Sequence, residues 1–89
     1  MILLVTYNLT EPSGSYGDLF DVLKSQKSWW HYLPSTWLVD SDSNAETLYN
    51  QLKPHLRTGD HILITKLDDN ERQGWLPKKA WGWIHRHDD

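Results

Sequence analysis

The sequence predicts an α+β sandwich in which two helices cover one face of a four-stranded antiparallel sheet. Three observations support this fold class. Four short segments are rich in apolar, β-branched and aromatic residues, and two longer segments repeat apolar residues at helical spacing. These segments follow one another in the order β-α-β-β-α-β, which is the ferredoxin-like split βαβ pattern, and a short C-terminal helix follows them.

The first strand is expected over residues 2–7, Ile-Leu-Leu-Val-Thr-Tyr. A continuous apolar run of this length is typical of a strand buried on both faces, at the centre of a sheet. Ser15 and Asp18 then resemble the capping box that begins a helix. An apolar helical stripe predicts that helix over 16–27, and it is formed by Tyr16, Leu19, Phe20 and Leu23.

A hairpin and a second helix follow. Aromatic and β-branched residues predict strands at 28–33 and 36–39, joined by a tight Pro-Ser connection. Ser43 and Glu46 fit a capping box for the second helix. We expect Pro54 to bend or end this helix, because proline removes a backbone donor.

The last strand is expected at 61–67, and residues 68–89 form a C-terminal extension of a single domain, 1–89. Pro77 fits the first turn of a short helix over 77–86. Both crossover helices lie on one face of the sheet, so the other face is open and has to be covered or used.

Composition excludes several classes of function. With no cysteine, the chain has no disulfide, thiolate zinc site, cysteine nucleophile or iron–sulfur cluster. A net charge of −3 argues against a globally basic nucleic-acid binder. The apolar runs are too short for a membrane span, so we expect a cytoplasmic protein with no membrane partner. The sequence also lacks the P-loop and the G-x-S-x-G nucleophile elbow.

Tryptophan is the most unusual feature, at six in 89 residues. Trp29, Trp30 and Trp37 lie on the predicted hairpin, and strand alternation sends Trp29 and Trp30 to opposite faces. One interpretation places these side chains in the core and in a dimer interface. The other makes them a stacking platform for bases or a nucleotide.

Several segments carry a family resemblance. Residues 28–39, Ser-Trp-Trp-His-Tyr-Leu-Pro-Ser-Thr-Trp-Leu-Val, together with 3–9, 52–56 and 74–76, resemble the small bacterial proteins labelled SinR-family, which are distinct from the helix-turn-helix repressor of that label. The chain is more distantly similar to the CRISPR-associated ferredoxin-fold endoribonuclease that partners the integrase in the adaptation complex. The resemblance implies a homodimer and a tie to nucleic acid.

Asn8 departs from the nuclease pattern, in which an aspartate ends the first strand after a tyrosine and is the proposed metal ligand. An amide is neutral and cannot act as a base. We therefore expect no cofactor, with Mg²⁺ bound only if the chain is a metal-dependent endonuclease. In that alternative the catalytic candidates are Asn8, Asp40 and His31, and Asp40 is expected beside Asn8 because both end central strands.

These observations predict a non-catalytic, homodimeric nucleic-acid- or nucleotide-binding protein. Besides the endonuclease, the alternative is a protein-interaction or inhibitor module anchored by exposed tryptophans. Lys78, Lys79 and Arg86 are the nearest approach to a basic patch, and it is small. The residues expected to line the ligand site come from the first two strands, and they are Thr6, Tyr7, Asn8, Trp30, His31 and Tyr32.

Two histidine features have competing interpretations. His31 is either a general acid or base or a hydrogen-bonded residue of the sheet. His85 and His87 form an H-x-H pair, which is either a metal site or, as we expect, part of a frayed terminus.

Overall fold

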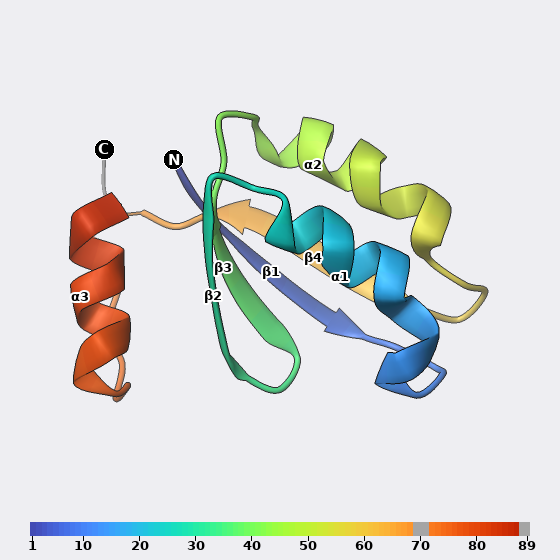
Figure 1. The fold of residues 1–89 in the computed structure, drawn as a ribbon, viewed down its shortest axis with the longest axis horizontal. Coiled ribbons are helices and arrows are strands. Elements are labelled where there is room, and N and C mark those ends of the chain that lie inside the picture. Colours follow the sequence, from blue (N-terminus) through green and yellow to red (C-terminus); the bar gives the residue numbers. More distant parts are fainter. Residues whose placement is uncertain (69–71, 88–89) are drawn as a thin grey trace.

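The computed structural model describes residues 1–68 and 72–87 and has an α+β architecture (Figure 1). The strands are β1 (Ile2–Asn8), β2 (Ser28–Leu33), β3 (Thr36–Asp40) and β4 (His61–Lys66). The α-helices are α1 (Gly17–Lys24), α2 (Ala45–Leu52) and α3 (Lys78–His87), with 3₁₀ turns η1 (Ser13–Tyr16) before α1 and η2 (Lys53–His55) after α2. The sheet order is β2-β3-β1-β4, and all neighbouring strands are antiparallel. The predicted α+β class and the four strands are therefore confirmed.

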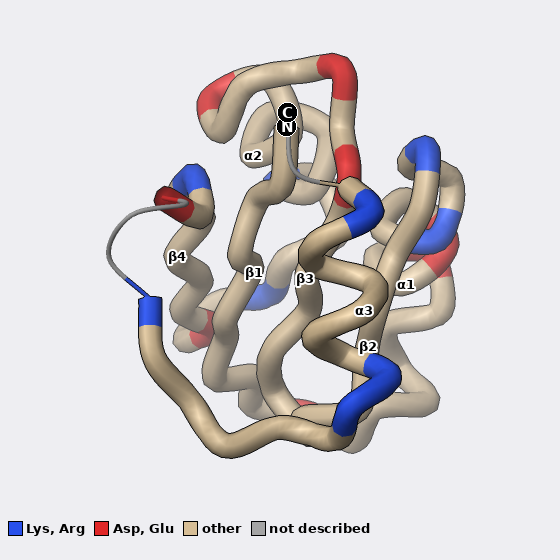
Figure 2. Tube along the Cα trace, turned by 90° about the vertical axis from the view of Figure 1, so that its left-hand side faces the viewer, with Lys and Arg blue, Asp and Glu red and all other residues tan. Residues whose placement is uncertain are grey.

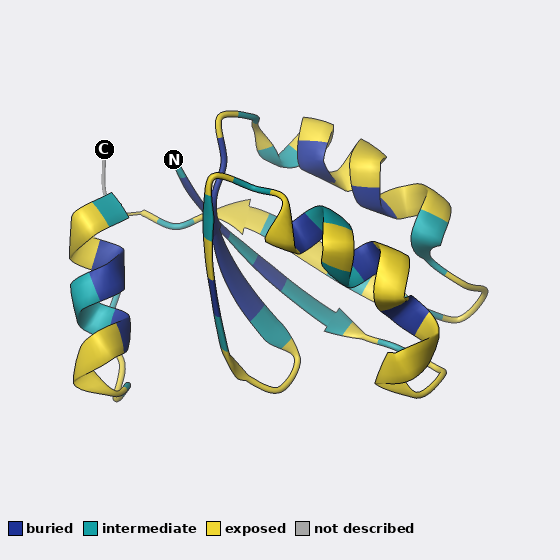
Figure 3. Cartoon of the chain, in the orientation of Figure 1, coloured by how far each residue is buried: buried dark blue, intermediate teal, exposed yellow. Residues whose placement is uncertain are grey.

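The main core lies between one face of the sheet and the helices α1 and α2 (Figure 3). Both helices are amphipathic, with leucines buried toward the sheet and polar residues turned outward. Burying one such leucine side chain contributes about 1.5–3 kcal/mol. The fully buried side chains that meet there include Leu3, Val5, Leu19, Leu23, Trp37, Val39, Leu48 and Leu52.

The helix α3 packs on the opposite face of the sheet, near the start of β1. Its buried residues Ala80, Trp83 and Ile84 form a second core with Ile2, Trp30 and Leu38. The Nε1–H group of Trp83 also donates a hydrogen bond to Ser28 Oγ at 3.0 Å. Within 1–68 and 72–87, no helix has the length and apolar character needed to cross a membrane.

The N-cap of helix α2 lies one residue later than predicted. Asn44 is the N-cap, and its side-chain oxygen accepts a hydrogen bond from the Thr47 backbone N–H at 2.8 Å. The expected capping box of Ser43 and Glu46 is therefore wrong. The Ser43 N–H is already taken, because it donates to Ser41 Oγ at 3.0 Å. At the other end, Pro54 lies in η2, where the α-helix gives way to a 3₁₀ turn as expected.

The helix α1 is shorter than predicted. It follows a 3₁₀ turn, and its N-cap, Tyr16, makes no side-chain capping bond, so the expected cap at Ser15 is wrong. It ends at Lys24, before the predicted end at residue 27. Ser25 Oγ and Gln26 Nε2 both donate to the Val22 carbonyl, and such local side-chain bonds compete with further helical bonding.

The edge strand β2 contains a bulge. Trp30 pairs with Leu38, whereas Leu33 pairs with Thr36, so two residues of β2 stand opposite a single residue of β3. An extra residue of this kind bends the strand and re-aims the neighbouring side chains.

Asp60 connects two loops at the far end of the sheet. Its carboxylate accepts hydrogen bonds from the Thr10 N–H and hydroxyl, from the Arg57 N–H and from the Tyr16 hydroxyl, at 2.7–2.9 Å. Burial raises the pKa of this carboxyl, but the hydrogen bonds together outweigh it and lower the pKa to about 2. These bonds hold the loop after β1 against the turn that begins β4.

Candidate functional site

Strand alternation along β2 places His31 and Tyr32 on opposite sides of the sheet. The ring of His31 stacks on Trp37 on the side of α1 and α2, with centroids 4.0 Å apart. Tyr32 meets Trp30 edge to face at 5.3 Å on the side of α3. Trp29 packs on Trp37 at 5.3 Å, so Trp29 and Trp30 face opposite sides, as predicted.

A groove of about 340 Å³ lies between β2 and α3, and we call it the β2–α3 groove. Five of its lining residues carry aromatic rings and two carry permanent positive charge. No carboxylate is among the described residues that line it. The lining residues are Trp29, Trp30, His31, Tyr32, Lys79, Trp83 and Arg86.

Positive charge surrounds this groove although the chain as a whole is acidic. Figure 2 shows lysine and arginine positions at both ends of α3 and, across β2, on the segment that follows α1. Lys24 continues this charge round the edge of β2, because its Nζ stands 5.8 Å from the centroid of the Trp29 ring, which packs on Trp37 on the α1 side. The groove thus combines flat aromatic surface with separate cations, as a site for bases and phosphates requires.

Trp30 and Trp83 form the interior of the groove, and they differ in the hydrogen bonding of their indole N–H groups. The Trp83 Nε1–H is paired with Ser28. The Trp30 side chain is 4 % exposed, and its Nε1–H has no hydrogen-bond partner among the described residues. A buried donor without a partner costs about 1–3 kcal/mol, so Trp30 is held there by packing alone.

A second hollow, of about 430 Å³, lies where β1, the β2–β3 turn and α1 meet, and we call it the β1-end pocket. Its polar lining includes Asn8, Glu11, Lys24 and His31, and its aromatic lining includes Tyr7, Phe20 and Trp37.

Tyr7 joins the wall of this pocket to the core. Its hydroxyl oxygen accepts a hydrogen bond from Trp37 Nε1 at 3.0 Å. Burial raises the pKa of the Tyr7 hydroxyl, and the bond from Trp37 lowers it by less. Tyr7 therefore stays neutral at ordinary pH, and its hydroxyl can donate a hydrogen bond to a ligand.

The predicted ligand residues divide between the two hollows. Tyr7 and Asn8 line the β1-end pocket, Trp30 and Tyr32 line the β2–α3 groove, and His31 lines both. Thr6 lines neither, because its hydroxyl turns to Thr36 Oγ1 at 3.3 Å and to the Ser35 carbonyl.

Sequence reasoning missed two residues of the β1-end pocket. They are Lys24 and Glu11, and no motif in the sequence singles out either of them. The sequence gives little indication of their role. Lys24 lines the pocket because it is the last residue of α1 and lies beside β2. That placement depends on how α1 packs, which the local sequence does not specify.

Asp40 and Asn8 do not come together. Asp40 pairs with Ile2 at one end of β1, whereas Asn8, at the other end, pairs with His61. The expected proximity of Asp40 and Asn8 is wrong. Antiparallel neighbours such as β1 and β3 run in opposite directions, so their last residues lie at opposite ends of the strand pair. Among residues 1–68 and 72–87, no three His, Asp or Glu side chains are grouped as metal ligands.

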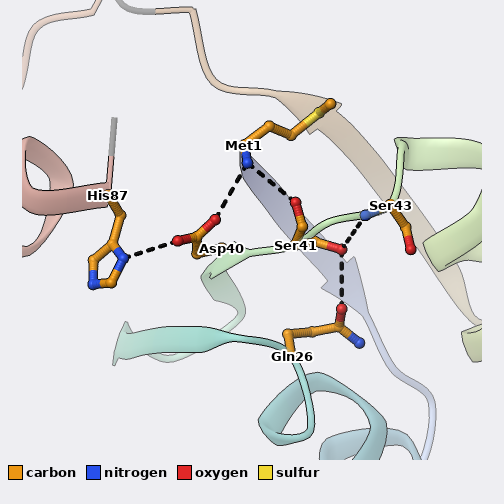
Figure 4. A network of polar contacts seen from close by, with 6 residues as sticks. All are labelled: Met1, Gln26, Asp40, Ser41, Ser43 and His87. Carbon is orange, nitrogen blue, oxygen red and sulfur yellow. Dashed lines mark hydrogen bonds and ion pairs between the residues drawn. The ribbon is translucent and has the colours of Figure 1, made fainter. Parts of the chain in front are cut away.

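Asp40 instead joins α3 to the sheet (Figure 4). It is buried, with Oδ2 2.9 Å from His87 Nδ1 and Oδ1 3.2 Å from the Met1 amino group. The expectation that His87 lies in a frayed terminus is therefore wrong: His87 ends α3 and contacts the sheet. Beside it, Ser41 Oγ donates to Gln26 Oε1 and ties β3 to the end of α1.

Comparison with known proteins gives no assignment. No protein-family model matches the sequence, and no curated protein matches it significantly. The family resemblance therefore rests on motifs within the sequence itself.

Proposed function

We propose that the protein binds single-stranded nucleic acid, or a nucleotide, in the β2–α3 groove. The observation that carries this proposal is the lining of the groove, in which aromatic rings and cations occur together without a carboxylate among the described residues. One aromatic side chain contributes about 1–3 kcal/mol for each base that stacks on it.

A single strand suits this groove better than a duplex. Stacking on Tyr32, which is exposed on the α3 side, requires a free base face, and paired bases inside a helix do not offer one. The cations are also few, with Lys79 and Arg86 lining the groove and Lys24 beside it. Because phosphate contacts dominate the affinity for duplex, three cations support only weak, salt-sensitive duplex binding.

We further propose a ferredoxin-like fold akin to the CRISPR-associated endoribonuclease and the SinR-labelled proteins. The strand order β2-β3-β1-β4, with all neighbours antiparallel, supports this assignment. The proposed protein binds without metal-dependent cleavage, since Asn8 is neutral and Asp40 lies at the other end of β1. The cytoplasm, where single strands are abundant, is the proposed location.

The proposed assembly is a homodimer. A row of side chains crosses all four strands on the α3 side of the sheet, and two exposed leucines, Leu33 and Leu63, end it. Thr36 and Thr6 lie between them, and a second copy is the proposed cover for this row. Native mass spectrometry should record a dimer that Leu63→Lys converts to a folded monomer. A wild-type monomer at micromolar concentration would refute this assembly.

Binding is tested by fluorescence anisotropy with labelled RNA and DNA single strands of about twelve nucleotides, which lies within the span of known single-strand sites. Two variants remove groove contacts: the double variant Lys79→Gln/Arg86→Gln, and Tyr32→Ala. The matched controls on α2 and η2 are Lys53→Gln and Tyr49→Ala, whose side chains are exposed and line neither hollow.

We expect both groove variants to weaken binding and both controls to leave it unchanged. The charge variant should also reduce the slope of log K against log salt by about 0.7 for each lost phosphate contact. Tyr32→Ala should leave that slope unaltered. Absence of single-strand binding at low salt, or equal affinities for the groove and control variants, would contradict the proposal.

A second candidate function is docking to another protein, and Trp75 favours it because its side chain is 100 % exposed. Exposed tryptophans are enriched among residues that anchor protein interfaces. A defined partner that copurifies with the wild type and is lost with Trp75→Ala would support this function. Copurification unaffected by Trp75→Ala would count against it.

A further inference from the structure

The two hollows meet at the edge of β2. His31 lines both the β2–α3 groove and the β1-end pocket. Lys24 lines the pocket, and its Nζ also stands over the ring of Trp29, which lines the groove. A ligand that leaves the groove around this edge therefore passes His31 and Lys24 and enters the pocket.

The β1-end pocket is suited in size and chemistry to one nucleotide. Its volume of about 430 Å³ falls within the usual range for small-ligand sites, about 300–1,000 Å³. Lys24 provides a cation for a phosphate beside the groove. Asn8 and the neutral hydroxyl of Tyr7 offer hydrogen bonds to a sugar or a base edge.

The loop after β1 closes the far side of the pocket. Glu11 and Ser13 of this loop line the pocket. The loop is held in place on both sides of Glu11, because Thr10 and Tyr16 donate to Asp60 and the Glu11 N–H contacts the Tyr16 hydroxyl at 3.3 Å. A carboxylate on this wall repels a second phosphate, so a strand does not continue beyond it.

We propose that the β1-end pocket receives the terminal nucleotide of a single strand whose adjoining nucleotides lie in the β2–α3 groove. This inference rests on the proposed function and adds that the protein binds strand ends. The phosphate that joins the terminal nucleotide to the rest of the strand lies at Lys24 and His31, and the terminal nucleoside lies against Tyr7 and Asn8.

The test compares linear and circular single strands of the same sequence, each labelled at one internal base. The linear strands carry a 5′-phosphate, a 3′-phosphate or hydroxyls at both ends. The pocket variant is Lys24→Gln, and the matched control is Lys27→Gln, a neighbouring exposed lysine that lines neither hollow. Thermal unfolding confirms that both variants are folded.

We expect the linear strand with hydroxyls at both ends to bind more tightly than the circle, because only a free end enters the pocket. One of the two terminal phosphates should weaken this binding, because it would lie against the carboxylate of Glu11. Lys24→Gln should weaken binding of the hydroxyl-ended strand about three- to fivefold, the effect of one partly exposed ion pair, and leave the circle unchanged. Lys27→Gln should bind every strand as the wild type does.

Two negative results have different meanings. Equal affinity for linear and circular strands, with binding still lost in Lys79→Gln/Arg86→Gln, would overturn end recognition and leave the groove function intact. Failure of every strand to bind would overturn the groove function and, with it, end recognition. A preference for linear strands that Lys24→Gln does not reduce would also overturn the assignment of the terminal nucleotide to this pocket.

Discussion

The imidazole of His31 lies nearly parallel to the indole of Trp37, with ring centroids 4.0 Å apart and an interplanar angle of 14°. Phe20 also stacks on Trp37, at 5.9 Å, so Trp37 is in contact with rings from both β2 and α1. Trp37 is almost completely buried, whereas His31 is half-buried and reaches both hollows. The stack therefore joins the main core directly to the proposed binding surface.

Removing this stack should destabilise the fold moderately. We expect His31→Ala to lower the free energy of unfolding by about 0.5–1.5 kcal/mol, the usual contribution of an aromatic pair. Urea denaturation measures this change. The control is His61→Ala, another strand histidine, exposed and without a described ring contact, so that the lower β propensity of alanine is common to both. Equal losses in the two variants would contradict a stabilising role for the stack.

Tyr7 should ionise later than an ordinary tyrosine. Burial raises its pKa above 10.0, although the hydrogen bond from Trp37 lowers the pKa in part. Because the folded state disfavours the tyrosinate, this contribution to stability is complete below pH 10.0 and is lost as the pH rises through the folded-state pKa. Tyrosinate absorbance, followed during an alkaline titration, should contain a late phase that Tyr7→Phe removes. A titration curve unaltered by Tyr7→Phe would refute the raised pKa of Tyr7.

Asp60 should make the protein sensitive to acid. Its hydrogen bonds outweigh the effect of burial and lower its pKa from 3.8 to about 2. A depressed carboxyl pKa stabilises the folded state above the unfolded value, so this stabilisation is lost as the pH falls from 3.8 towards about 2. Asp60→Asn should lower Tm at neutral pH, and its difference from wild type should shrink across that acid range. Asp21→Asn, at an exposed position of α1, is the control and should behave as wild type does.

Gly59 should not tolerate a side chain. Its φ is +93°, and a Cβ there would lie 3.0 Å from Thr10 Cγ2. We expect Gly59→Ala to cost about 1–2 kcal/mol, because L residues are strained at positive φ. Gly14→Ala is the matched control, since its Cβ would meet nothing within 4 Å and its φ is not positive. Chemical denaturation that places both variants at the same stability would contradict this account.

The bond between Trp83 and Ser28 should help to hold α3 on the sheet. Ser28→Ala leaves a buried indole N–H without its partner, which costs about 1–3 kcal/mol. Hydrogen exchange should then accelerate in α3 before it does in α1. In a Trp83→Phe background the same substitution should cost much less, because no N–H remains to be paired. An equal cost in the two backgrounds would show that the bond is not responsible.

Helices and strands were predictable because their patterns are local. The alternation of aromatic residues in 28–33 predicts that Trp29 and Trp30 face opposite sides, and the structure confirms it. The helical spacing around Leu19 and Leu23 predicts a helix packed on the sheet. Errors occur where two local solutions compete, as at Ser43 and Asn44, which are adjacent residues able to cap the same helix.

Features that join distant parts of the chain were not predictable from such patterns. The contact between Asp40 and His87 spans 47 positions. It depends on α3 crossing the sheet near the start of β1, which no property of either residue indicates. The position of Asp40 itself was predictable, because β3 runs antiparallel to β1 in the expected topology. The bulge in β2 has no such signal, although it decides that Leu33 pairs with Thr36 and lies on the side of α3.

The bulge also makes the two edges of the sheet unequal. Along β4 the pairing with β1 is regular, so its outer backbone groups keep the regular spacing, narrow and wide pairs in alternation, that an added antiparallel strand needs. On β2 the extra residue breaks that spacing. Fibril growth by strand addition needs two competent edges on every copy, and this sheet provides one. Two copies that paired edge to edge through β4 would leave only bulged edges outside, so such growth would stop at the pair.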